Sequence, residues 1–162
     1  MSTNIKDFAY KKQAPTDAAV NGVLNGFMTW FLLSEYTSVP VLSTPGSDFS
    51  HSLLGTLVMP AVVIAFIISM VTSKMTINKR IKGEVTPSLT KGVKWAGRAF
   101  KHGIGRAILN VFIVYGLGGL ILQFAPDILI SRLAASIIVF FMAGILAYIE
   151  SVSAVLRTRS IQ

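Results

Sequence analysis

The chain has no cysteine, only 7 acidic residues and only 2 histidines among its 162 residues. The missing cysteines exclude a disulfide framework, thiolate metal ligands and a cysteine nucleophile. Charged residues make up 14% of the chain, against about 25% in ordinary soluble domains. Because hydrophobic residues reach 52%, the composition excludes a disordered chain and argues against a soluble globular protein. The length suits one ordinary domain and is too short for two large ones.

Long stretches without Asp, Glu, Lys or Arg divide the chain. They are residues 18–34, 49–73, 107–126 and 133–149. A helix needs about 20 largely apolar residues to cross the bilayer core, whereas the strands of a membrane barrel alternate polar and apolar residues. The sequence therefore predicts an all-α integral membrane protein with four transmembrane helices in two antiparallel hairpins. We expect the helices near 17–37, 52–73, 103–124 and 133–155.

The basic residues predict how the chain is oriented. Of the 15 Lys and Arg residues, all except Arg132 fall on one side of a four-helix zigzag. The positive-inside rule then places both termini in the cytoplasm, and we expect a bacterial inner (plasma) membrane. The predicted segments are an N-terminal tail (1–16), a first hairpin (17–73), a basic cytoplasmic loop (74–102), a second hairpin (103–155) and a C-terminal tail (156–162).

The middle loop has the pattern of a basic amphipathic helix over 88–102. Thr86 and Pro87 form a typical helix start. At helical spacing, the cations share one stripe opposite apolar residues, which predicts an interfacial helix whose cations contact anionic lipid headgroups. The alternative is that these cations are solvated and only fix the topology. Nucleic-acid binding is not expected, since the segment adjoins the bilayer. The candidate lipid contacts are Lys91, Lys94, Arg98 and Lys101.

Two of the predicted membrane helices share a short pattern. Residues 23–27 read VLNGF and residues 108–112 read ILNVF, so Asn25 and Asn110 occupy matching places. Both segments run in the same direction, and either a duplicated hairpin or the small alphabet of membrane helices would explain the match. Gly22 and Gly26 form a GxxxG pair, which favours close helix packing within the chain or between copies.

Glu150 is the most notable acid, because it lies in the predicted fourth membrane helix. An intramembrane acid suggests a functional group. Its distance from Arg157 is about 10 Å along a helix that rises about 1.5 Å per residue. This shallow depth favours the alternative of an interfacial acid paired with a nearby cation. We therefore take Asn25, Asn110 and Glu150 as the candidate intramembrane polar residues.

The chain lacks the HExxH, GxSxG, GxxxxGK[ST] and GxGxxG motifs. The two histidines, His51 and His102, fall on opposite sides of the membrane in the predicted topology. We therefore expect no enzyme, no metal site and no cofactor. The sequence favours a structural or interaction subunit that forms a homo-oligomer or joins another membrane protein. The alternative is an oligomeric transporter or channel for a small solute or ion.

Overall fold

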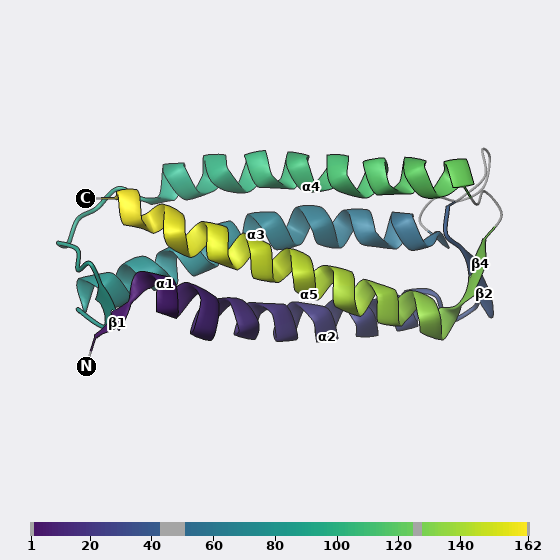
Figure 1. Ribbon diagram of the computed structural model, residues 1–162, viewed down its shortest axis with the longest axis horizontal. Helices are drawn as coiled ribbons and strands as arrows, with labels where there is room; N and C mark the ends of the chain where they lie inside the picture. The colour runs from purple at the N-terminus through teal and green to yellow at the C-terminus, as the bar shows by residue number, and fades with distance from the viewer. Residues whose placement is uncertain (1, 43–50, 125–127, 162) are drawn as a thin grey trace.

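The computed structural model describes residues 2–42, 51–124 and 128–161. Four long helices run up and down beside one another (Figure 1), as the sequence predicts. Two helical stretches are long and apolar enough to cross a membrane by length and composition: Leu53–Ile81, and Arg132–Ser160, which includes a short 3₁₀ helix at its end. The four helices are α2 (Ala14–Leu32), α3 (Leu53–Ile81), α4 (Ala96–Phe124) and α5 (Arg132–Arg157).

The helices do not pack in the order of the chain. Helix α2 packs along α5, α5 packs along α3, and α3 packs along α4, whereas α2 with α3 and α4 with α5 meet at few places. The two helices of each predicted hairpin therefore do not pack along one another. Instead, the two hairpins pack on each other, and the helices lie in the order α2, α5, α3, α4. Helices α2 and α4, which carry the matching VLNGF and ILNVF segments, therefore lie at the two outer edges of the bundle.

Small residues set the contact between α2 and α5. A Cβ atom added at Gly26 would lie 2.9 Å from Phe140 Cβ and 3.2 Å from the Ser136 carbonyl oxygen. A Cβ atom at Gly22 would lie 3.0 Å from the Phe140 carbonyl oxygen. The absence of side chains at these glycines therefore lets α2 approach α5 closely, and the GxxxG pair is used inside the chain.

The N-terminal segment is an ordered part of the bundle. Strand β1 (Thr3–Asn4), helix α1 (Ile5–Asp7) and the π-helix η1 (Phe8–Gln13) lead directly into α2. Ile5 and Phe8 are buried in a small cluster with Val85 and Val155. Strand β1 also pairs in parallel with β3 (Val85–Thr86) at the start of the middle loop. The segment predicted as an N-terminal tail therefore connects the bundle to this loop.

The predicted interfacial helix over 88–102 is wrong. Residues 87–95 contain no helix, and α4 begins at Ala96 and continues without a break beyond residue 103. Gly92 has a φ of +92°, a conformation that favours glycine and interrupts a right-handed helix. A residue of α3 also holds the loop, because Arg80 Nε donates to the Pro87 carbonyl oxygen at 2.7 Å. Residues 96–102 are therefore the first turns of α4.

The opposite end is closed by a short ribbon. Strand β2 (Ser38–Pro40) pairs antiparallel with β4 (Leu129–Ser131). Arg132 follows β4, lies 3.6 Å from the centre of the Trp30 ring and donates to the Ser34 carbonyl oxygen at 2.9 Å. The single cation expected on this side therefore has local partners in the chain. A short 3₁₀ helix, η3 (Thr158–Ser160), follows α5 at the other end.

Candidate functional site

A buried ion pair joins α4 and α5. The side chain of Glu150 is completely buried, and that of Arg106 is 23% exposed. Arg106 Nε lies 3.0 Å from Oε1 and 2.9 Å from Oε2 of Glu150, and a terminal nitrogen lies 2.9 Å from Oε1. A buried carboxylate is costly unless it is paired and hydrogen-bonded. Arg106 supplies the partner that the interfacial-pair interpretation of Glu150 requires.

Arg106 was not among the residues singled out from the sequence. It lies inside the predicted helix 103–124. The signal that could have identified it is depth, because Arg106 lies just inside the predicted third helix and Glu150 just inside the end of the fourth. An acid and a base at matching depth in antiparallel helices are candidates for a pair.

His102 lies one turn before Arg106 on α4 and contacts two side chains of α5. Its Nε2 is 3.0 Å from Ser153 Oγ, and its Nδ1 is 3.0 Å from a terminal nitrogen of Arg157. A guanidinium only donates hydrogen bonds, so Nδ1 accepts, and we assign the proton of the neutral ring to Nε2. His102 then donates to Ser153. In this tautomer the ring is not placed to take a proton from Ser153, so the pair lacks the arrangement of an activated serine.

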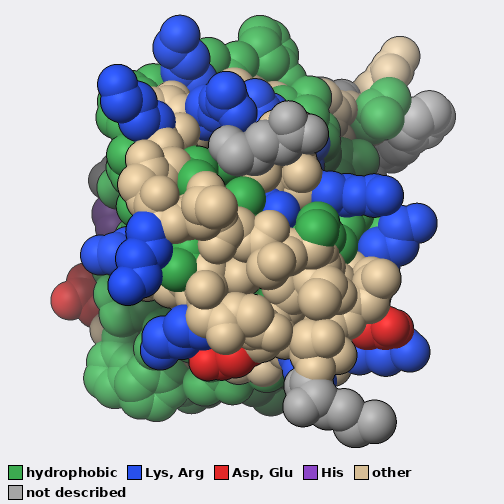
Figure 2. All heavy atoms as spheres, turned by 90° about the vertical axis from the view of Figure 1, so that its left-hand side faces the viewer, with side chains coloured by type: hydrophobic (Ala, Val, Ile, Leu, Met, Phe, Trp, Pro, Cys, Tyr) green, Lys and Arg blue, Asp and Glu red, His purple; other side chains and the backbone are tan. Residues whose placement is uncertain are grey.

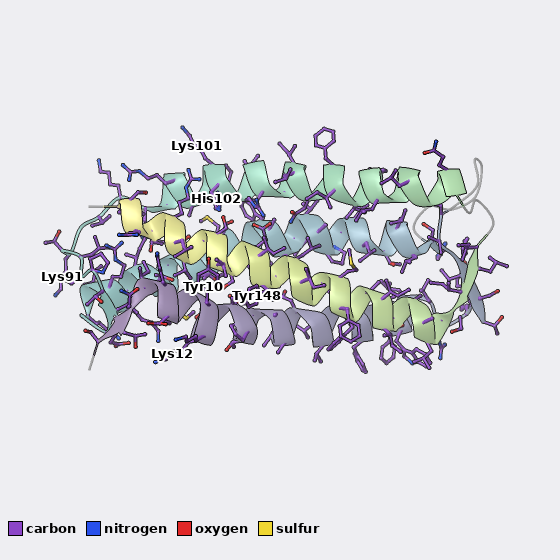
Figure 3. All side chains as sticks on the ribbon, in the orientation of Figure 1. Tyr10, Lys12, Lys91, Lys101, His102 and Tyr148 are labelled. Carbon is purple, nitrogen blue, oxygen red and sulfur yellow. The ribbon has the colours of Figure 1, made fainter. Side chains whose placement is uncertain are left out.

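The surroundings of His102 favour its neutral form. Burial lowers the pKa of His102 below its ordinary value of 6.5, and Arg157 and Arg106 lower this pKa further, whereas Glu150 raises it. His102 precedes the predicted membrane segment 103–124. Figure 3 shows that His102 lies between α4 and α5, while its neighbour Lys101 projects away from the bundle. The ring is therefore an internal hydrogen-bonding group, and no sequence motif around His102 identifies it as one.

The two asparagines have different surroundings. Asn110 is 1% exposed, and its Nδ2 donates to the carbonyl oxygen of Ala61 in α3 at 3.3 Å. Asn25 is half-buried, and its Nδ2 donates to the carbonyl oxygen of Asn21 in its own helix at 2.8 Å. Asn25 also lines a cavity of about 400 Å³ between α2 and α3, which neither Asn110 nor Glu150 lines. The structure does not bring the three candidates together.

The four candidate lipid contacts also separate into two groups. Lys91 and Lys94 are exposed in the non-helical loop, whereas Arg98 and Lys101 are exposed on the first turns of α4. Arg98 lines a cavity together with Arg157 of α5. Figure 2 shows this end of the bundle, where Lys and Arg side chains surround the face and acidic side chains are few.

Within residues 2–42, 51–124 and 128–161, no group of three or more His, Asp or Glu side chains could hold a metal ion. Glu150 and His102 both have partners within the chain, as described above. No protein-family model, curated protein or solved structure matches this chain.

Proposed function

We propose that this chain is a four-span protein of the bacterial inner membrane that acts as a structural or interaction subunit by helix–helix association with further copies. The arrangement of charge supports the topology. Both termini and the basic middle loop lie at one end of the bundle (Figure 1), and Lys and Arg side chains gather there (Figure 2). The positive-inside rule assigns such an end to the cytoplasm.

The observation that carries the proposal is the open face of α4. Most of the other described helical glycines meet a neighbouring part of the chain: Gly103 of α4, for example, faces Phe66 and Ser69 of α3, whereas Gly97 in the first turn of α4 is open. In contrast, a Cβ atom at Gly105 or Gly116 would meet nothing within 4 Å. Glycine costs a helix up to about 1 kcal/mol relative to alanine, and in membranes small residues favour close helix contacts.

Gly105 and Gly116 share one face of α4. They are separated by 11 residues, which is close to three helical turns. Phe112, on the same side, is 70% exposed, and Ile108 is 54% exposed. Helix α4 packs mainly on α3, so this face is free of other parts of the described chain. A second copy of α4 would cover it and bring the glycines into contact.

The pairing of the larger interior polar groups favours association over transport. Glu150 is paired with Arg106, Asn110 with a carbonyl oxygen, and His102 with Ser153. Each of these groups is held by the chain itself, so none is left to bind a passing solute.

Self-association is tested by energy transfer between labelled copies in liposomes at increasing dilution in lipid. Gly105→Ile combined with Gly116→Ile should weaken association at least about tenfold, because side chains would separate the helices by more than close contact allows. Ala19→Ile, an equally exposed position on α2, is the control and should have no effect. A wild-type chain that stays monomeric at high density, or equal effects of the two changes, would contradict the proposal.

The topology has a separate test. Reporters fused to either terminus should be active only in the cytoplasm, and a reporter inserted at Gly46 only outside it. Activity outside the cytoplasm from either terminus would refute the four-span arrangement.

One observation favours transport as the second candidate. The cavity between α2 and α3 brings Asn25, Thr29 and Thr56 beside Pro60, and broken or polar membrane helices are typical of transport sites. Ion flux into proteoliposomes that is lost with Asn25→Leu, and kept when Gly105 and Gly116 are replaced, would favour this candidate. Glu150→Gln is the control variant for the flux measurement, since it alters the interior of the bundle and Glu150 does not line this cavity.

A further inference from the structure

A second cavity lies at the basic end of the bundle, between α3, the start of α4 and the end of α5. Its volume is about 470 Å³, within the usual range for small-molecule sites. Its walls come from three parts of the chain that are distant in sequence. They are formed by Ser73, Trp95, Arg98, Ala99, Arg157, Thr158, Ser160 and Ile161.

The cavity is cationic. Arg98 and Arg157 both line it, and no acidic side chain of the described residues does. Neither arginine forms an ion pair within the described part of the chain. Glu150, the acid of α5, is already engaged by Arg106. The Arg157 guanidinium donates one hydrogen bond to the neutral His102 ring, and it carries five donor hydrogens.

The wall also holds a hydroxyl group. Ser73 is 6% exposed and lines the cavity, so its hydroxyl can donate to a ligand there. The first turn of α4 lies at the same place, since Trp95 and Ala99 line the cavity, and the positive end of a helix favours anions.

From these features we infer that the cavity binds a phosphate group. Two guanidinium groups and the Ser73 hydroxyl are donors beside a helix N-terminus, and phosphate presents several acceptor oxygens that arginine engages in pairs. The volume leaves room for a substituent on the phosphate. The group comes either from the headgroup of an anionic phospholipid, since the cavity lies at the proposed membrane surface, or from a phosphorylated solute.

Tryptophan fluorescence gives a direct test. The chain has 2 tryptophans, and the other one, Trp30, lies at the opposite end under Arg132. In a Trp30→Phe background, the emission of Trp95 therefore reports on the cavity. Inorganic phosphate, titrated against chloride at constant ionic strength in detergent, should cause a saturable change. Nanodiscs of phosphatidylcholine with and without phosphatidylglycerol form the second arm.

The decisive comparison uses two variants that remove the same charge. Arg98→Gln with Arg157→Gln should weaken the response at least about tenfold, because each lost charge-assisted hydrogen bond is worth about that factor. Lys91→Gln with Lys94→Gln removes two neighbouring exposed cations outside the cavity and should weaken it less than about threefold. Ser73→Leu keeps both arginines but fills the cavity, and it should also abolish the response if the arginine variant does not fold.

Each outcome is informative. A response to phosphatidylglycerol alone identifies the lipid headgroup, and a response to inorganic phosphate alone identifies a soluble ligand. No response in either arm, or equal losses in the two double variants, would overturn the site and leave a general attraction for anions. The inference does not rest on self-association, because the Gly105→Ile and Gly116→Ile variant should bind phosphate as the parent does.

Discussion

Arg106 and Glu150 connect two helices that otherwise meet at few places. Arg106 lies on α4 and Glu150 on α5, and their side chains form three contacts of 2.9–3.0 Å. Helix α4 packs mainly on α3. The ion pair is therefore a second attachment for an edge helix, and it fixes α4 relative to the fourth helix as well as to the third.

The first prediction concerns this pair. Arg106→Gln should lower the free energy of unfolding by about 3–5 kcal/mol, because it leaves a fully buried carboxylate without its cation. Glu150→Gln should cost less, since the Arg106 side chain is 23% exposed and can reach water. Replacing both residues by Leu should restore stability to within about 1–2 kcal/mol of the parent. Denaturant unfolding in detergent measures these values, and additive single and double effects would show that the pair is not coupled.

The second prediction is a pH dependence caused by His102. The pKa of His102 is lowered below 6.5 in the folded protein, mainly by burial and then by Arg157. The unfolded chain therefore binds more protons below this pH, and the stability present above 6.5 should decline as the pH falls through that value. Unfolding temperatures measured from about pH 8 to about pH 5 should show this decline, and it should be reduced in His102→Gln. The variant His51→Gln is the control, and a decline that persists unchanged without His102 would assign it to another group.

The four helices could be predicted because charge-free runs report directly on helix length. Their neighbours could not be predicted in the same way. Apolar faces are chemically interchangeable, so the sequence does not reveal that α2 packs on α5 instead of α3. The predicted helix start before residue 96 is also wrong. The spacing of cations over 88–102 suits a helix, but the positive φ of Gly92 and the hydrogen bond from Arg80 keep residues 87–95 non-helical.

The candidate site was accessible to sequence reasoning only in part. Glu150 stood out because an acid in an apolar run is unusual. Its partner lies 44 residues away in sequence, and this pairing depends on how the helices pack. His102 gave no signal, because a histidine beside a basic loop resembles any surface residue. Ser73 and Arg157 both line the cavity at the basic end, and nothing in the sequence pattern indicates that they lie near one another.

The third prediction compares two glycines. Gly26→Ala should lower the free energy of unfolding by about 1–3 kcal/mol, because the new methyl group would lie 2.9 Å from Phe140 Cβ and force α2 away from α5. Gly97→Ala, in α4, should be neutral or stabilising by up to about 1 kcal/mol, since nothing lies within 4 Å of the added atom. Thermal unfolding in detergent distinguishes the two. Equal effects would mean that α2 does not approach α5 as closely as described.

The fourth prediction separates the two asparagines that the internal pattern aligns. Asn110→Leu should be tolerated for membrane insertion but should lower stability by about 1 kcal/mol, because the amide is buried and donates to the carbonyl oxygen of Ala61 across the contact with α3. Asn25→Leu should have a smaller effect, since its amide donates only to Asn21 in the same helix, and Leu suits the apolar wall of the neighbouring cavity. Unfolding in detergent of each variant, alone and combined, gives the comparison. A larger loss for Asn25→Leu would show that Asn25 has a partner beyond its own helix, either in a second copy or in a bound solute, and would direct attention to the cavity between α2 and α3.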